Sequence, residues 1–170
     1  MSKLLQDYRN YLKIERAMSR NTVASYCSDV EKFLSSAGLK PEEMRAADVE
    51  DYLAGLKALS KRSQARYLSS IRSFFDWLTI EGVVDGNPCD MVDAPKLGRY
   101  LPEVLSIEEV EAMLSVPDLS SWQGLRDKAL LEILYGCGLR VSEAVDLRIS
   151  CLFFDEGYIR VIGKGDKERL

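Results

Sequence analysis

Apolar residues recur with a helical period through the first ninety residues of the chain, and short polar breaks divide the pattern into four segments. The first covers residues 3–18, and the second, residues 19–38, begins with a serine suited to an N-cap and ends at a glycine. A short third helix is expected from about residue 48, and a long fourth helix over residues 60–79. Short connections between amphipathic helices favour a compact four-helix bundle.

A change in composition marks the end of this bundle. Glycine and an Asn-Pro pair interrupt residues 81–88, where a helix cannot continue, and residues 94–102 are rich in proline, glycine and basic side chains. We therefore expect a first domain over residues 1–95, a linker over 96–105 and a second domain over 106–170.

The second domain is expected to begin with helices. Ser106 and Glu109 have the spacing of a capping box at the start of a short helix that reaches about Leu114. A longer apolar helix is predicted over residues 124–137, and a further turn or two over 141–147.

Strands are expected after these helices, because the hydrophobic period changes to two. Residues 158–162 alternate in this way, with 151–154 and the shortened segment 168–170 as predicted partners in one small antiparallel sheet. The predicted fold class is therefore mainly α, a helical domain followed by the incomplete start of an α+β domain.

Composition excludes several classes of protein. No apolar run reaches the roughly 20 residues of a membrane-spanning helix, and the four widely spaced cysteines favour reduced thiols in a cytoplasmic protein. The chain has no histidine, the commonest metal ligand and general base, and we predict no bound metal. The net charge of −4 argues against nucleic-acid binding through bulk positive charge but permits a local basic surface.

The fourth predicted helix offers a candidate binding face. Arginine and hydroxyl side chains recur there at helical spacing, opposite the apolar stripe, and are suited to phosphates and to base edges in a major groove. The residues are Arg62, Arg66, Ser69 and Ser73, with Lys61 and Arg72 beside them. A merely solvated helix face is the alternative.

A second candidate site combines Arg140, just after a helix-ending glycine, with Lys164 on a glycine-flanked turn. The planar fork of an arginine can hold two phosphate oxygens, and a lysine supplies a mobile charge or a proton. Separately, Arg140 could cap helix carbonyls and Lys164 could be a plain surface residue. Glu143 could pair with Arg140 or orient a neighbour.

These residues carry a resemblance to a known family. Residues 131–143 and 161–170 closely resemble the tyrosine site-specific recombinases, a phage-integrase-like family, and are most similar to its Xer group. Residues 19–29, 66–75 and the junction 87–102 are similar to the family's core-binding domain, which has a SAM-like fold, and to its linker.

The resemblance implies a role for each candidate residue. Arg140 matches the arginine that clamps the scissile phosphate, and Lys164 matches the hairpin lysine that protonates the leaving 5′-oxygen. Asn21 and Thr22 join the fourth helix as DNA contacts of the core-binding domain. The implied partners are double-stranded DNA and a second recombinase subunit, and no cofactor is implied, because a phosphotyrosine link conserves the bond energy.

The chain also departs from the family pattern. The His-x-x-Arg pair and the tyrosine nucleophile of the family have no counterpart in these residues, so the resemblance predicts a truncated recombinase that cannot cleave DNA alone. A non-enzymatic DNA-binding module derived from a recombinase is one alternative, and a helical protein-interaction domain is another. Chromosome resolution and mobile-element integration both remain open as biological roles.

Overall fold

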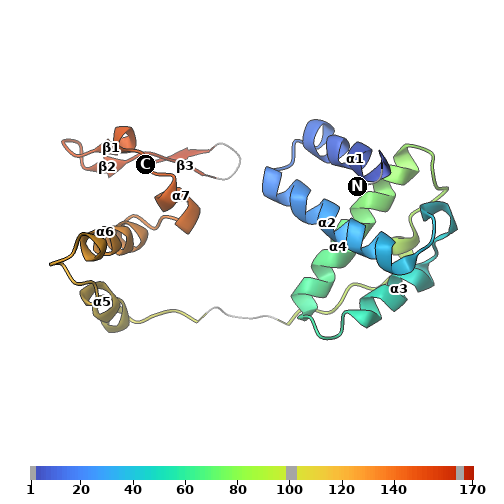
Figure 1. Ribbon diagram of the computed structural model, residues 1–170, viewed down its shortest axis with the longest axis horizontal. Coiled ribbons are helices and arrows are strands. Elements are labelled where there is room, and N and C mark those ends of the chain that lie inside the picture. The colour runs from blue at the N-terminus through green and yellow to red at the C-terminus, as the bar shows by residue number, and fades with distance from the viewer. Residues whose placement is uncertain (1–2, 99–102, 164–166) are drawn as a thin grey trace. The chain divides into compact units, whose positions relative to one another are not determined.

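The computed structural model describes residues 3–98, 103–163 and 167–170, and the chain divides into two compact units, Met1–Tyr100 and Leu101–Leu170 (Figure 1). Within the described residues, no helix is both long enough and apolar enough to cross a membrane.

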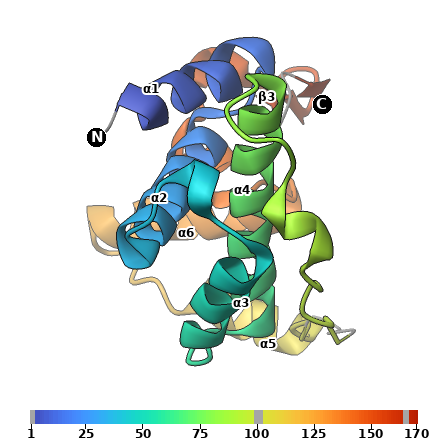
Figure 2. The same cartoon turned by 90° about the vertical axis from the view of Figure 1, so that its right-hand side faces the viewer.

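The first unit is a helical bundle in which α2 packs against α4, while α1 and α3 lie near opposite ends of α4 (Figures 1 and 2). The bounds of its helices are α1, Lys3–Asn10; a π-helical turn, Tyr11–Glu15; α2, Arg20–Ala37; α3, Ala46–Gly55; and α4, Lys61–Ile80. Two 3-10 turns, Pro41–Glu43 and Pro88–Met91, complete it.

The predicted N-cap residues of α2 and α4, and the predicted end of α2, are confirmed. The Ser19 hydroxyl accepts a hydrogen bond from the backbone N–H of Thr22 (3.2 Å), and the Ser60 hydroxyl accepts one from Ser63 (3.1 Å). Gly38 ends α2 with a φ of 64°, a left-handed conformation that glycine adopts without steric cost. The local sequence therefore sets both ends of α2 and the start of α4.

The first helix ends earlier than the sequence predicted, at Glu15 instead of Met18. Its last turn is π-helical, and the N–H of Met18 reaches back to the carbonyl of Leu12 (3.0 Å). The wider turn lets two adjacent residues, Tyr11 and Leu12, both enter the core. Ala17 closes the turn with a φ of 47°, which an L-residue with a Cβ adopts at a cost.

Aromatic side chains fill the core of the first unit. Tyr8 of α1 meets the ring of Phe74 edge-on, with centroids 5.2 Å apart, and Phe33 of α2 meets Phe75 in the same way at 6.3 Å. Edge-to-face contacts of this kind favour one arrangement of the helices over others. The core thus fixes which face of α4 is left at the surface.

The second unit has three helices followed by short strands. The bounds are α5, Ile107–Ser115; α6, Trp122–Gly136; α7, Val141–Val145; a 3-10 turn, Ile149–Cys151; β1, Leu152–Phe153; β2, Tyr158–Ile159; β3, Val161–Ile162; and β4, Glu168–Arg169. The predicted capping box of α5 is confirmed, since Ser106 and Glu109 each accept the other's backbone N–H.

The strands differ from the single sheet that the sequence predicted. β1 pairs with β2 and β3 pairs with β4, both antiparallel, in two separate two-stranded sheets. The division falls at Arg160, whose N–H donates to the carbonyl of Cys151 (2.9 Å). The predicted pairing partners are correct, but the expected continuous strand over residues 158–162 is broken.

Much of the apolar surface of the second unit stays exposed. Its buried cluster consists of Leu139, Ala144 and Val161, with Leu130 and Ile133 packed partly against it. Large exposed apolar residues include Val104, Ile107, Val116, Trp122, Leu125, Val145 and Ile149. The few buried residues sit beneath the start of α7 and beside β3, and so support the segment that carries Arg140.

The left-handed φ of Ala17 leads to the first prediction. Replacing Ala17 with glycine removes the clash of its Cβ, and we expect the free energy of unfolding to rise by about 0.5–1 kcal/mol. The same change at Ala24, an exposed position inside α2, is the matched control and should lower stability by about 0.5–1 kcal/mol. Urea unfolding of both variants measures the two effects, and a loss of stability for Ala17→Gly contradicts the expectation.

Candidate nucleic-acid interface

Arg62 and Ser69 lie on the exposed face of α4. Arg62 has no hydrogen-bond or ion-pair partner among the described residues, so its guanidinium is available to a ligand. The Ser69 hydroxyl donates to the carbonyl of Ala65 one turn back (3.0 Å) and keeps its lone pairs toward solvent.

Arg66 lies on the same face, and its side chain is oriented by contacts within the protein. It forms an ion pair with the buried carboxylate of Asp29 in α2, which also accepts a hydrogen bond from the Ser70 hydroxyl (2.9 Å). Its guanidinium lies 4.9 Å from the ring centroid of Tyr67. The Arg66 side chain is nevertheless 47% exposed, so it is oriented without being buried.

Lys32 is a residue of this face that sequence reasoning missed. It comes from α2, and its Nζ lies 3.4 Å from the hydroxyl and 5.9 Å from the ring centroid of Tyr67. Lys32 and Arg66 therefore flank one aromatic ring from two helices. The signal in the sequence was its position three residues after Asp29, which places both on neighbouring parts of one helix face.

Arg72 and Ser73 make contacts within the protein. The Arg72 guanidinium donates to the backbone carbonyls of Cys89 (3.0 Å) and Val92 (3.3 Å), and so ties the segment after α4 to the helix. The Ser73 hydroxyl accepts a hydrogen bond from the hydroxyl of Tyr8 (3.1 Å). Both side chains are half-buried, and their predicted role in DNA binding stays a prediction.

Asn21 and Thr22 occupy the first turn of α2. The Thr22 hydroxyl lies 2.8 Å from that of Ser19 and belongs to the helix cap, whereas Asn21 is exposed. The N-terminal turn of a helix presents unpaired N–H groups and a partial positive charge, which favour anions.

Arg140 is the N-cap residue of α7, and Glu143 binds it twice. One carboxylate oxygen accepts the backbone N–H of Arg140 and the other accepts its guanidinium, both at 2.7 Å. The Glu143 side chain is 6% exposed, while that of Arg140 is 65% exposed. Of the open alternatives, the pairing with Glu143 is therefore correct, and it leaves most of the Arg140 side chain exposed.

Arg169 on β4 is a second arginine in this cluster, and no role was assigned to it from the sequence. Its Nη2 donates to Glu143 (2.6 Å) and to the carbonyl of Gly138 (3.3 Å). Arg169 lies directly opposite Val161 in the β3–β4 register, so both side chains face the same side of the sheet. Val161 is buried against Leu139 and Ala144. Pairing residue 169 with residue 161 in the sequence analysis would therefore have predicted that Arg169 faces the buried side of the sheet.

Gly163 brings the end of β3 to the same cluster. A side chain at this position would begin 3.5 Å from Glu143 Oε1 and 3.9 Å from Arg140 Nη1. Lys164, the next residue and the predicted proton donor, lies outside the described residues. Gly163 therefore lies within van der Waals distance of the Arg140–Glu143 pair.

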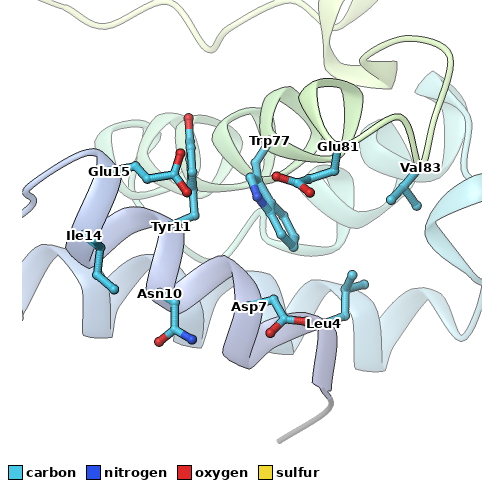
Figure 3. A pocket seen from close by; sticks show the side chains of 9 residues that line it. All are labelled: Leu4, Asp7, Asn10, Tyr11, Ile14, Glu15, Trp77, Glu81 and Val83. Atoms are coloured by element: carbon cyan, nitrogen blue, oxygen red, sulfur yellow. The ribbon is translucent and has the colours of Figure 1, made fainter.

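A pocket of about 390 Å³ in the first unit is lined by acidic side chains, opposite in charge to the face of α4 that carries Arg62. Carboxylates of Asp7, Glu15 and Glu81 line it together with the rings of Tyr11 and Trp77, between α1, the π-helical turn and the end of α4 (Figure 3). Negative side chains at this spacing repel a phosphate within roughly 10 Å. This side of the unit is therefore unsuited to nucleic acid, unlike the face that carries Arg62.

Two sequence families match the chain. The family described as "Phage integrase, N-terminal SAM-like domain" matches residues 5–82, and the one described as "Phage integrase family" matches residues 103–170. The first match lies within the helical bundle, and the second covers α5 to β4.

Curated relatives match over the whole chain. Tyrosine recombinase XerD of Listeria monocytogenes is 40% identical over 177 aligned residues, which cover 100% of this chain and 60% of that protein. Tyrosine recombinase XerD of Chlorobaculum tepidum is 44% identical, with 99% and 58% covered. The chain therefore spans about 60% of the length of these relatives.

A solved structure has the same fold. A lambda integrase dimer bound to a COC′ core site matches with a TM-score of 0.77 and 19% identity, over 98% of this chain and 59% of that one. At this identity the likeness shows the fold alone.

The Glu143 carboxylate leads to the second prediction. Hydrogen bonds from the backbone N–H of Arg140, and then the guanidiniums of Arg140 and Arg169, hold the pKa of Glu143 below its usual range. An unfolded chain has a glutamate pKa of about 4.3, so ionised Glu143 stabilises the second unit above that pH. We expect this stabilisation to be lost as the pH falls through the lower, folded value.

Urea unfolding of the wild type and Glu143→Gln tests this effect. The stability gap between them should shrink as the pH falls from about 6 through the lowered pKa of Glu143, because the wild-type carboxyl then becomes protonated too. Glu156→Gln, at an exposed position in the turn between β1 and β2, is the matched control and should change stability little. A gap that stays constant over this range contradicts the expectation.

Proposed function

The chain belongs to the phage integrase family of tyrosine recombinases, and on that premise we propose that it binds double-stranded DNA in site-specific recombination. The observation that carries the proposal is the cluster at α7, where an exposed arginine is oriented by a buried carboxylate beside the end of β3. Such an arrangement suits a phosphate, because the guanidinium fork is fixed before the ligand arrives.

We assign Arg140 to the scissile phosphate and Lys164 to protonation of the leaving 5′-oxygen. Phosphoryl transfer depends mainly on positioning and on neutralising charge at the non-bridging oxygens, and a leaving alkoxide needs a proton donor. The contacts of Arg140 support its part in this proposal, since Glu143 holds one guanidinium nitrogen while the side chain as a whole stays 65% exposed. No metal or organic cofactor enters the proposed reaction.

We assign the first unit to core binding of the DNA duplex. The support is the basic face of α4, with Arg62 exposed, Arg66 held by Asp29, and Lys32 added from α2. Asn21 at the start of α2 belongs to the same proposed role. The proposal extends to a second recombinase subunit of the family as partner and to the cytoplasm as the site of action.

We further propose that none of the tyrosines described in the structure is the nucleophile. Tyr8, Tyr11 and Tyr67 are buried in the first unit, and burial raises the pKa of Tyr8 and brings that of Tyr52 to about 12. A nucleophilic oxygen must reach the phosphorus, which a buried hydroxyl cannot do. Tyr135 and Tyr158 are exposed, and for them the proposal rests on the family resemblance, which gives their segments no catalytic tyrosine. Tyr100 lies outside the described residues.

The third prediction tests the duplex-binding face. Arg62→Ala and Lys32→Ala each remove one phosphate contact, and we expect each to lower the log–log salt slope of duplex binding by about 0.9. Neither change breaks a buried ion pair, so the melting temperature should stay nearly constant. Fluorescence anisotropy with a labelled duplex, at several salt concentrations, measures the slope.

The matched control for these variants is Lys40→Ala with Lys57→Ala, which removes two charges from exposed positions elsewhere in the first unit. The control should keep the wild-type slope. If Arg62→Ala and Lys32→Ala leave both affinity and slope unchanged, the face of α4 does not dock on DNA.

The fourth prediction concerns covalent chemistry. With a nicked suicide substrate, the 170-residue chain should form no protein–DNA adduct, because Tyr8, Tyr11 and Tyr67 are buried and the exposed Tyr135 and Tyr158 lie in segments that the family resemblance does not link to catalysis. Denaturing gels with labelled DNA provide the measurement. If an adduct forms, Phe substitutions of Tyr135, Tyr158 and Tyr100 would locate the nucleophile, and the assignment above would be wrong.

A further inference from the structure

We propose that Arg169 is a positioning residue that keeps the positive charge of Arg140 available to a DNA phosphate. The inference rests on the proposed phosphate role of Arg140 and adds a residue that does not itself touch the phosphate. It arises from the sharing of one carboxylate by two guanidiniums.

The contacts define the cluster. Glu143 receives Arg140 Nη1 at 2.7 Å on one oxygen and Arg169 Nη2 at 2.6 Å on the other. The same Arg169 nitrogen donates to the carbonyl of Gly138, two residues before Arg140 (3.3 Å). Arg169 therefore contacts both the turn that leads to Arg140 and the side chain that orients it.

The charges explain why a second guanidinium is needed. Arg140 paired with Glu143 alone would be close to neutral, and an incoming phosphate would meet the negative carboxylate as well as the arginine. With Arg169 on the far oxygen of Glu143, the cluster carries one net positive charge. Glu143 can then orient Arg140 without cancelling its attraction for an anion.

The position of Arg169 on β4 adds a connection to the hairpin. Arg169 pairs in register with Val161 of β3, and β3 leads through Gly163 to the segment that contains Lys164. The hydrogen bonds of Arg169 to Glu143 and Gly138 thus join this hairpin to the N-terminus of α7.

The test is duplex binding by the full 170-residue chain, measured by anisotropy with a labelled DNA duplex at low salt. Arg140→Gln should weaken binding about tenfold, the loss of one charged hydrogen-bond contact. Arg169→Gln should weaken it about threefold, as for one unit charge acting over several ångströms through water. Arg169→Lys, which retains the charge, should restore most of the affinity.

Two double variants separate positioning from direct contact. In the Arg140→Gln background, Arg169→Gln should cost little more, because its effect acts through Arg140. Arg148→Gln, at an exposed arginine of the same unit, is the matched control. Its effect on DNA affinity should be the same with and without Arg140→Gln. Glu143→Gln added to Arg169→Gln removes the uncompensated carboxylate and should recover binding, an outcome that a merely structural role would not produce.

The proposal is overturned if Arg169→Gln binds DNA like the wild type, or if Arg169→Gln weakens binding as much in the Arg140→Gln background as in the wild type. It is also overturned if neither Arg169→Lys nor the double variant Glu143→Gln with Arg169→Gln recovers affinity. Circular dichroism of each variant distinguishes lost binding from lost folding. If Arg140→Gln itself leaves affinity and salt slope unchanged, the proposed phosphate role of Arg140 fails, and the role of Arg169 fails with it.

Discussion

The buried carboxylate of Glu143 is the interaction on which the functional part of the second unit depends. It caps α7, orients Arg140 and receives Arg169 from β4, so that one side chain joins a helix start and a strand. An unpaired buried carboxylate would be strongly destabilising, and three donors are therefore needed to keep it charged. Its lowered pKa has the same origin, with the backbone N–H of Arg140 as the largest contribution.

The first unit repeats this arrangement in a different setting. Asp29 is buried between α2 and α4, where it binds Arg66 and the Ser70 hydroxyl, and the Arg66 side chain stays half exposed. In both units a carboxylate that solvent hardly reaches fixes the direction of an arginine that solvent does reach. An arginine held in this way loses less side-chain entropy when it binds a phosphate, which supports the proposed role of both residues.

Sequence reasoning succeeded where short-range geometry decides the structure. Ser19, Ser60 and Gly38 set the limits of α2 and α4, and Ser106 with Glu109 opens α5. It failed at the end of the first helix, because the π-helical turn forms to bury both Tyr11 and Leu12, a demand of the core that no local pattern contains. It also failed at Arg160, where the alternating segment 158–162 divides between two partners, since Tyr158–Ile159 pairs with β1 and Val161–Ile162 pairs with β4.

The sequence by itself determined the helical bundle, the capping residues, the arginine face of α4 and the residue types of the Arg140 cluster, because these depend on spacing along the chain. The tertiary structure decided which charges are held and which are free. Arg62 has no partner among the described residues, whereas Arg72 is tied to the carbonyls of Cys89 and Val92. Lys32 joined the face, and Arg169 joined Glu143, only because packing brought together residues separated by 35 and 26 positions.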